Sequence, residues 1–548
     1  MFRRLLFILL AFGAFSGSGY CKDELVLGIS QAPGTMNPLN SSTLAQLLIQ
    51  NMTSRPFTAY DPDWNLVCLL CTELPNLKAG TARVVDLPDG KKGMEIDVEM
   101  KPMQWGDGVP VTTKDVAFTI EVGKHPLTGV ASAEGYRRIL KIDIKDDHRF
   151  TLTINRVTFH YSNIGLRLLP AHIERPIFEA NPAEYRTQTA FDTDPTNPGL
   201  TYGPYRIVEL EPHNRIVLER NPAWTGQKPY FKRLIVKIIE NTTALETNML
   251  SGNLDYVLGE LGLSFVQALA FEKRHNVNYD VVYKPSLTYE HIDMNLDNVL
   301  FKDRRVRQAL LESIDRSAIS EKLFEGKQPV ADSCISPLDP MFSPAAKQYR
   351  YDPASARKLL EEAGFADIRD NVRTNARGER LSMELVTTAG NRMREQLAQI
   401  VQSQFRNVGI EVRLKAVSPR AFYEILDRRT FTGLALYAWI ERPEGVPRRA
   451  LHSTEIPTAA NGWVGLNYPA YRNPQMDKAL DDAEGELDPR ARRALFADIQ
   501  RIYSEDLPVL PLFFRADPFV IPKALKGITP TGHFNGSTLW VEHWRWEE

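Results

Sequence analysis

The stretch TYGPYRIVELEPHNRIVLERNPAW, residues 201–224, decides the fold. Two β-rich runs, at 205–210 and 215–219, flank Pro212-His213-Asn214, a composition typical of a tight turn. Gly203-Pro204 places a rigid turn before the first run. A β-branched run follows at 233–239. The stretch therefore predicts a hairpin with a third strand close behind it.

Toward the N-terminus, the pattern changes from strand to helix within thirty residues. Residues 94–101 alternate strictly between apolar and polar side chains, which predicts a half-buried strand. Trp105-Gly-Asp-Gly108 predicts a turn. Thr112, with Asp115 three places on, predicts a helix start with a capping box.

Toward the C-terminus, the chain becomes more helical. Apolar residues four apart predict one helix from Val306, ended by Gly326. Further helices are expected at 353–363, 397–405 and 488–504, with a strand at 410–414. No short repeat and no low-complexity linker divides the chain. We expect mixed α/β lobes without an obvious boundary between them.

Composition excludes several classes of protein. The 548 residues are 43% hydrophobic and 24% charged, as in ordinary globular proteins. A net charge of −2 argues against a nucleic-acid binder, which would carry a basic excess. The GxSxG, HExxH and GxxxxGK[ST] motifs are all absent from the sequence. We therefore expect no catalytic residues, no metal and no cofactor, and keep an exported hydrolase as the alternative from another class.

The N-terminus is typical of a secretory signal peptide, assigned to residues 1–21. A basic start, Arg3-Arg4, precedes an apolar run of residues 5–15 and a small-residue tail. That run is too short to span a bilayer, which takes about 20 residues. The prediction is an exported, soluble, periplasmic protein. The alternative is a lipid anchor at Cys21, although Tyr20 departs from the small residues that usually precede a lipidated cysteine.

The remaining cysteines allow two disulfide pairings. Cys68 and Cys71 form a CxxC, which in an oxidising compartment predicts a local disulfide. Either of them could instead pair with Cys334. No second CxxC exists, so a four-cysteine zinc site is excluded. The Asp61-x-Asp63-x-Asn65 string lacks the glycine of a calcium loop and is interpreted as a turn.

Six strings, in order along nearly the whole mature chain, resemble one protein family. They are LVLGISQAPGTMNP (25–38), MQWGDGVPVTTKDVAFTIE (103–121), the 201–224 stretch, SGNLDYV (251–257), FKDRRVRQALLESIDRSAI (301–319) and YDPASARKLLEEAGF (351–365). Each string alone is weak, but their order makes the resemblance specific. The chain resembles the extracytoplasmic solute-binding proteins of peptide-type ABC importers, the oligopeptide- and dipeptide-binding family (solute-binding family 5).

The resemblance implies an α/β fold of the two-lobed periplasmic binding protein (Venus-flytrap) type. Two hinge strands join the lobes, and the first lobe carries an extra subdomain. The implied limits are 22–57, 196–278 and 508–548 for lobe I, 58–195 for the subdomain, and 279–507 for lobe II.

The implied function is capture of a peptide or peptide-like ligand between the lobes and delivery to ABC transporter permease subunits in the inner membrane. The protein would act as a monomer and would bind no nucleic acid. One alternative keeps the fold but changes the cargo to an anionic small molecule, an opine, a sugar or a metal chelate. Another is a sensor or chaperone-like role for the same binding module.

The resemblance also locates a ligand site. In the family, a tryptophan is followed three places on by an aspartate that binds the ligand's terminal amine. Here Tyr437-Ala-Trp439-Ile-Glu441-Arg442 matches the tryptophan, but arginine takes the aspartate's position. An inward Glu441 would bind the amine, whereas an inward Arg442 would prefer a carboxylate or another anion. Alternatively, the two residues pair with each other at the surface.

Two loops supply the other candidate ligand-binding residues. Gly34 and Thr35 lie in a loop that in the family offers backbone groups to the ligand. Asn461 and Trp463 lie in a second loop expected to face the cleft. The Arg448-Arg449 pair could bind a distal carboxylate, or it could lie in a solvated loop.

Overall fold

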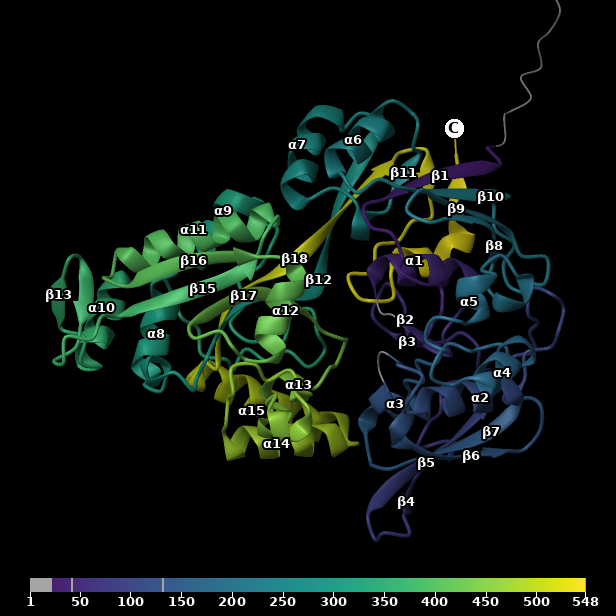
Figure 1. Cartoon of the computed structure of the whole chain (residues 1–548), viewed down its shortest axis with the longest axis horizontal. Coiled ribbons are helices and arrows are strands. Elements are labelled where there is room, and N and C mark those ends of the chain that lie inside the picture. Colours follow the sequence, from purple (N-terminus) through teal and green to yellow (C-terminus); the bar gives the residue numbers. More distant parts are fainter. Residues whose placement is uncertain (1–21, 41–42, 131–132, 548) are drawn as a thin grey trace, which may run out of the picture.

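The computed structural model describes residues 22–40, 43–130 and 133–547. The predicted signal peptide (1–21) and Cys21 lie outside the described residues. Figure 1 shows two α/β masses, one purple to blue and the other green, connected by two long crossing strands. In the described part of the chain, no helix combines the length and apolarity that a membrane crossing requires.

Lobe I is built on a five-stranded sheet of order β11-β1-β10-β9-β8. Its strands are β1 (Glu24–Ile29), β8 (Tyr205–Glu211), β9 (Arg215–Arg220), β10 (Arg233–Ile238) and β11 (Tyr256–Val257). The predicted hairpin is confirmed as the antiparallel β8–β9 pair, and its turn residue His213 adopts φ 58°. Helices α1 (Leu44–Thr53), α6 (Thr242–Leu250) and α7 (Phe265–His275) accompany this sheet.

The extra subdomain has a sheet of its own, ordered β4-β5-β7-β6. The strands are β4 (Ala82–Asp86), β5 (Lys92–Glu99), β6 (Ile139–Ile144) and β7 (Arg149–Ile154), next to the small β2 (Thr58–Tyr60) and β3 (Leu66–Cys68) ribbon. Its helices are α2 (Thr113–Lys124), α3 (Ala133–Arg138), α4 (Ala171–Ala180) and α5 (Ala190–Thr193), with the 3-10 turn η1 (Phe159–Ser162). The capping box of Thr112 and Asp115 is confirmed at the start of α2.

Lobe II contains a five-stranded sheet of order β16-β15-β17-β12-β18. The strands are β12 (Tyr279–Met294), β15 (Ser382–Thr388), β16 (Glu411–Val417), β17 (Leu434–Ile440) and β18 (Val509–Pro522). The helices are α8 (Arg304–Glu312), α9 (Arg316–Phe324), α10 (Pro353–Glu362), α11 (Arg392–Arg406), α12 (Pro419–Asp427), α13 (Arg448–Leu451), α14 (Pro474–Gly485) and α15 (Pro489–Asp506). Two short ribbons, β13 (Asp367–Arg369) with β14 (Val372–Thr374) and β19 (Leu525–Lys526) with β20 (Arg545–Trp546), complete the strands.

The single helix predicted from Val306 to Gly326 is wrong. The structure has two helices, α8 and α9, separated at 313–315. Asp315 caps α9 by accepting a hydrogen bond from the Ala318 amide at 2.8 Å. The four-residue apolar spacing continues across the break because both helices pack on one core, so periodicity alone did not reveal the cap.

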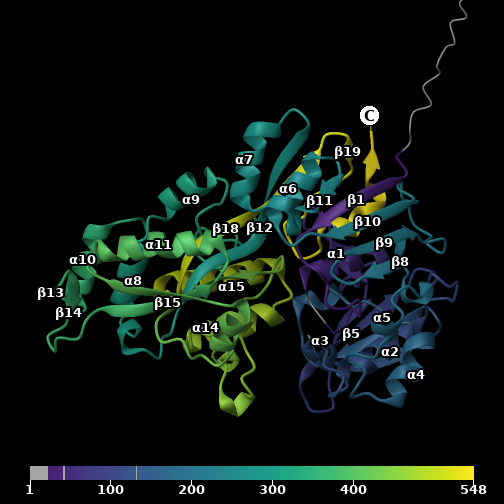
Figure 2. The ribbon, with the colours of Figure 1, turned by 45° about the horizontal axis from the view of Figure 1, so that its top comes forward.

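The crossing strands β12 and β18 are the hinge. They pair antiparallel from Tyr279↔Pro522 to Asp293↔Val509, with a register shift near Pro285. One end of the pair contacts α7 and β11 of lobe I, and the other end belongs to the lobe II sheet. Figures 1 and 2 show this pair as the connection between the two masses. Both strands thus run through both lobes.

The lobes also touch away from the hinge, between the extra subdomain and the α14–α15 region, at a place that we call the distal contact. Arg156 of the subdomain lies 3.3 Å from Glu484 of α14, and Arg138 lies 3.6 Å from the same carboxylate. Beside them, the guanidinium of Arg492 from α15 lies 4.1 Å from the ring centre of Phe159. Lobe II therefore rests on the extra subdomain through charged and aromatic side chains.

The cysteines are placed at two distant points. Cys68 and Cys71 form a disulfide within the subdomain, with Cα atoms 5.3 Å apart. Cys334 is a free thiol buried in lobe II. The Asp61 string forms a turn in which the Asp61 carboxylate accepts from the amides of Asp63 and Asn65, both at 2.9 Å.

Candidate functional site

A cavity of about 980 Å³ lies between the lobes, and we call it the cleft cavity. Lobe I contributes residues 240–243 and 264–267, and lobe II contributes residues 388–394 with Pro419 and Tyr423. Helices α6, α7, α11 and α12 all begin at this cavity. In lobe II it lies at the carboxyl end of β15, the usual position for a ligand in α/β sheets.

The lobe II sheet leaves one side of β17, at its C-terminal end, without a strand partner in the part of the chain that the structure describes. β15 pairs with β17 only from Leu434 to Leu436, whereas β17 continues to Ile440 along β12. Among the residues that the structure describes, no strand pairs with the β15 side of 437–440. Ile440 is 66% exposed. We call this four-residue stretch the open edge of β17.

A buried ion triad lies on one face of the lobe II sheet, next to β12 and β18. The Glu290 carboxylate is bound by Arg394 at 2.7 Å and by Arg515 at 2.9 Å. Burial alone would raise the pKa of Glu290, but the two guanidinium groups outweigh it and hold that pKa below its usual value. Arg394 also lines the cleft cavity. Of the three side chains of the triad, only Arg394 reaches the wall of the cavity.

Sequence reasoning missed the triad. Residues 290, 394 and 515 are more than a hundred positions apart, and no local motif contains any two of them. The fold brings them together, because Glu290 lies on β12, Arg515 lies on the neighbouring β18, and Arg394 lies in the first turn of α11. Arg394 lies in the first turn of α11, three residues before the start of the helix predicted at 397–405, so the prediction did not include it.

Tyr437 and Trp439 lie on the opposite face of the sheet from the triad. Tyr437 is buried and donates its hydroxyl to the Asp293 carboxylate at 2.6 Å. Trp439 is half-buried and stacks on Tyr468, with ring centres 5.9 Å apart. The Trp439 ring therefore packs against the aromatic core of lobe II around Tyr437 and Tyr468.

The side chains of Glu441 and Arg442 have different surroundings in the structure. Glu441 lines a small cavity inside lobe II, and burial raises the pKa of its carboxyl to about 7. Arg442 opposes that rise, and Asp339 adds to it. Arg442 is exposed, and its guanidinium lies 5.7 Å from the ring centre of Phe534 in lobe I. Among the described side chains, no ion pair joins the two residues.

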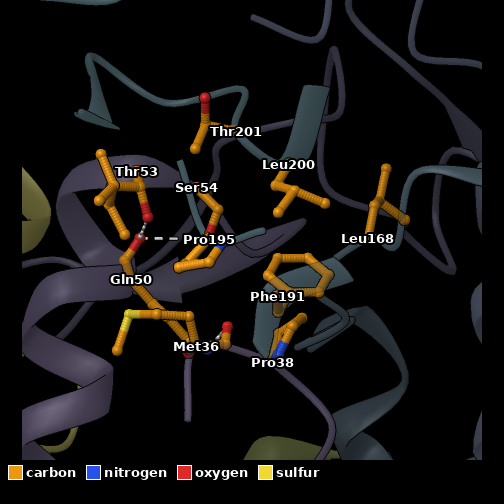
Figure 3. Close-up of a pocket in the computed structure, with 11 residues that line it drawn as sticks. Met36, Pro38, Gln50, Thr53, Ser54, Leu168, Phe191, Pro195, Leu200 and Thr201 are labelled. Carbon is orange, nitrogen blue, oxygen red and sulfur yellow. Dashed lines mark hydrogen bonds between the residues drawn. The ribbon is translucent and has the colours of Figure 1, made fainter. Parts of the chain in front are cut away.

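Gly34 and Thr35 lie in the loop after β1. Gly34 is exposed, and a side chain there would meet no atom within 4 Å. Thr35 is anchored, because its hydroxyl donates to Asp192 at 2.6 Å. Figure 3 shows the small cavity beside this loop, where Met36, Pro38 and Phe191 lie near Gln50 and Thr53 of helix α1. That cavity lies within the packing of lobe I and the subdomain.

Asn461 and Trp463 lie in a turn of lobe II that does not line the cleft cavity. The Asn461 side chain accepts from the Thr458 amide and donates to the Ile456 carbonyl, both at 2.9 Å. Trp463 lies under the Arg428 guanidinium at 5.2 Å. The structure does not bring these two residues together with Trp439 or Gly34.

The two arginines after the Trp439 segment have different surroundings. Arg448 forms an ion pair with Asp481, and Arg449 is exposed. Over the described residues, no group of three or more His, Cys, Asp or Glu side chains is arranged to hold a metal ion.

Two α/β lobes on a pair of crossing strands, with a large cavity between them, define a hinged solute-binding protein. The chain belongs to the bacterial extracellular solute-binding proteins, family 5, because the model described as "Bacterial extracellular solute-binding proteins, family 5 Middle" matches residues 91–454. The predicted family and the two-lobed fold are therefore confirmed.

Three similar proteins cover nearly the whole chain. The oligopeptide-binding protein AppA of Bacillus subtilis is 26% identical over 515 residues, 92% of this chain and 88% of its own. The nickel-binding periplasmic protein of Escherichia coli is 23% identical over 533 residues, 93% of each chain. The crystal structure of the oligopeptide-binding protein from Thermus thermophilus complexed with a pentapeptide matches with a TM-score of 0.78, at 28% identity and 96% coverage of both chains.

Proposed function

We propose that this chain is an exported, monomeric solute-binding protein that captures a peptide between its two lobes and delivers it, chemically unchanged, to the permease of an ABC importer. The family match and the oligopeptide-binding relatives support this proposal. Export follows from the predicted signal peptide and from the extracellular character of the family.

The open edge of β17 is the observation that carries the proposal. Residues 437–440 are already held in strand geometry by β12, so their second edge can pair with an extended chain. Strand addition gives affinity through main-chain hydrogen bonds, whatever the side chains of the ligand are. A peptide is the class of solute that supplies an extended backbone of matching donors and acceptors.

Charges around the cleft support a ligand with a carboxylate. Arg394 lines the cleft cavity, and the Arg442 guanidinium is exposed and lies near Phe534 of lobe I. Guanidinium groups bind carboxylates in bidentate fashion. The same guanidinium groups support one second candidate, an anionic non-peptide cargo such as a metal chelate, since the chain is also similar to a nickel-binding protein over 93% of its length.

Calorimetry with backbone-modified peptides tests the proposal. After unfolding and refolding to remove co-purified ligand, peptides methylated at single backbone nitrogens should bind about tenfold more weakly at one or two positions, because each methyl group removes a main-chain donor. Equal affinity at every position would overturn strand addition. Tight binding of anionic chelates without any peptide binding would favour the second candidate.

Side-chain variants test whether the Trp439 segment belongs to the ligand-binding site. We expect Glu441→Ala or Arg442→Ala to weaken ligand binding by about 2 kcal/mol, the scale for losing a desolvated charged hydrogen bond. Arg449→Ala, in an exposed position on the same segment, is the matched control. Unchanged affinity in both site variants would remove the Trp439 segment from the binding site.

A further inference from the structure

A turn that follows β17 is buried at its tip. Residues 442–445, which we call the latch turn, are closed by a hydrogen bond from the Gly445 amide to the Arg442 carbonyl at 3.0 Å. Turns usually lie on the surface of a protein. Here Pro443, at the tip, is buried, although the neighbouring Arg442 is exposed. Residues from elsewhere in the chain therefore cover the tip.

The residues that cover the latch turn belong to lobe I and its extra subdomain. The Tyr60 hydroxyl of β2 donates to the Pro443 carbonyl at 3.3 Å. The Phe534 ring centre lies 5.7 Å from the guanidinium group of the turn's first residue. Burial and that guanidinium group lower the pKa of His160, whereas a hydrogen bond with the main chain of Glu444 raises it, so His160 also lies beside the turn. We call Tyr60, His160 and Phe534 the socket.

A carboxylate of lobe II holds the latch turn in one conformation. Asp339, which is 6% exposed, accepts from the Glu444 amide at 2.8 Å and from the Met341 amide at 2.7 Å. Glu444 has φ 57°, a left-handed conformation that glutamate adopts uncommonly. Such conformations persist where the surrounding structure holds them. Asp339 therefore fixes the shape that the socket receives.

The socket is fixed as well. The Tyr60 amide donates to Asn535 Oδ1 at 3.0 Å, and the Tyr60 ring meets the His533 ring edge-on at 6.1 Å between centres. Burial, with Glu444 close by, raises the pKa of Tyr60 to about 12, so its hydroxyl keeps its proton and remains a donor at neutral pH. The turn and the socket are thus each held by their own lobe, and only a movement of the lobes separates them.

The latch turn begins two residues after the open edge of β17. Glu441, between them, remains bound to the sheet, because its amide donates to the Leu287 carbonyl of β12 at 3.3 Å. A peptide paired with residues 437–440 would therefore hold one end of this segment while the socket holds the other. Contacts that are present only when the lobes are together shift the balance toward closure.

We propose that Tyr60 and Asp339 are positioning residues for ligand capture. Asp339 shapes the latch turn, Tyr60 seats it when the lobes close, and together they retain the ligand without touching it. The inference rests on the proposed function, because it presumes a peptide lying along the open edge of β17. The seated turn slows the escape of the ligand, so its loss changes the dissociation rate and leaves the association rate as it is.

Stopped-flow kinetics with a fluorescent peptide that calorimetry has shown to bind tests the proposal. Tyr60→Phe removes only the hydroxyl and should make dissociation about threefold faster, whereas Tyr60→Ala also removes a wall of the socket and should make it about tenfold faster. Asp339→Asn places an amide donor or a single acceptor where two amides now donate, and about fivefold faster dissociation is expected. The matched controls are Tyr351→Phe and Tyr351→Ala, at a tyrosine of lobe II that is 41% exposed.

Small-angle scattering distinguishes this role from a merely structural one. Saturating peptide should lower the radius of gyration of the wild type, and the decrease should be smaller in Tyr60→Ala, because its lobes close less completely. A residue that only stabilises the fold would lower the free energy of unfolding in urea and leave this response to peptide unchanged.

Two kinetic results would overturn the proposal: wild-type dissociation rates in both Tyr60→Ala and Asp339→Asn, or an equal acceleration in Tyr351→Ala. If Tyr60→Ala fails to fold, Tyr60→Phe provides the same comparison. If no peptide binds at all, the proposed function fails, and the latch turn is still tested by itself. In that case ligand-free Tyr60→Ala should have a larger radius of gyration than the ligand-free wild type, and equal radii would exclude a role of the turn in closure.

Discussion

Two of the places where the lobes meet, the hinge and the distal contact, are built from different interactions. At the hinge, β12 and β18 are joined by main-chain hydrogen bonds, and the adjoining Glu290 is completely buried between two arginines. At the distal contact, the ion-pairing side chains remain partly in solvent, with Glu484 14% exposed and Arg156 30% exposed. The hinge is therefore permanent, whereas the distal contact can separate.

This difference indicates where the protein opens. Exposed ion pairs contribute up to about 1 kcal/mol each, so separating the distal contact takes little free energy. Breaking the hinge would expose a buried charge network and a strand ladder. Ligand contacts that exist only when the lobes are together can then shift the balance toward closure. The comparison leads to three predictions, from the largest expected effect to the smallest.

Loss of Glu290 should produce the largest effect. Glu290→Ala leaves Arg394 and Arg515 without their shared carboxylate, and we expect the free energy of unfolding to fall by about 3–5 kcal/mol. Urea denaturation measures it. Asp482→Ala, which removes an exposed ion pair with Lys478 on α14, is the control and should change stability by less than about 0.5 kcal/mol. If both substitutions lowered the free energy of unfolding by the same amount, the hinge triad would be no more important for stability than an exposed ion pair.

Much of the fold could be predicted because its signals are local. The 205–219 hairpin, the Thr112 cap and the helix from Pro353 to Glu362 each depend on neighbouring residues, and each is confirmed. The break between α8 and α9 was missed because a cap at Asp315 interrupts the chain without interrupting its apolar spacing. Lobe boundaries stay a prediction, since β12 and β18 belong to both lobes.

The distal contact should contribute less free energy than the hinge, and its contribution to the closed state should be measurable as a change in ligand affinity. Glu484→Gln removes the charge that Arg138 and Arg156 share, so the closed state should lose about 1 kcal/mol and the dissociation constant should rise about fivefold. Calorimetry at low and high salt measures it, and the difference between wild type and variant should shrink as salt increases. Asp482→Asn on the same helix should leave affinity unchanged. A variant that binds as tightly as the wild type would show that the contact plays no part in closure.

Acid should weaken the distal contact through His160. Burial, together with Arg442 and Arg492 of lobe II, lowers the pKa of His160 to about 4. Once the lobes separate, that pKa returns toward about 6.5, so the open state takes up protons more readily. The contribution of His160 to closure is therefore complete above pH 6.5 and is lost as the pH falls toward 4.

At pH 5.5 we expect the closed state to lose about 1 kcal/mol relative to pH 7.5, because half-burial reduces the full shift. His160→Gln should remove this dependence, whereas His213→Gln, in the exposed β8–β9 turn, should not. Affinity measured across that range tests it. An identical pH profile for wild type and His160→Gln would assign the acid response to another group.

The candidate site was less predictable than the fold. The Trp439 segment was located through its resemblance to a family motif, but the direction of Glu441 and Arg442 could not be derived from their order in the chain. Glu290, Arg394 and Arg515 share no local pattern, and the His291–Asp293 pair shows only the alternation of any buried strand. Charged residues on different strands and helices can be predicted to form a pair only when the arrangement of those elements is known.

Distance measurement across the distal contact tests the central claim most directly. Fluorophores on Lys141→Cys of β6 and Lys478→Cys of α14, which are 66% and 75% exposed, report the separation of subdomain and lobe II by single-molecule energy transfer. With a peptide whose binding calorimetry has established, the populations should converge on one narrow, high-transfer state. Identical distributions with and without that bound peptide would contradict closure of the lobes on a ligand.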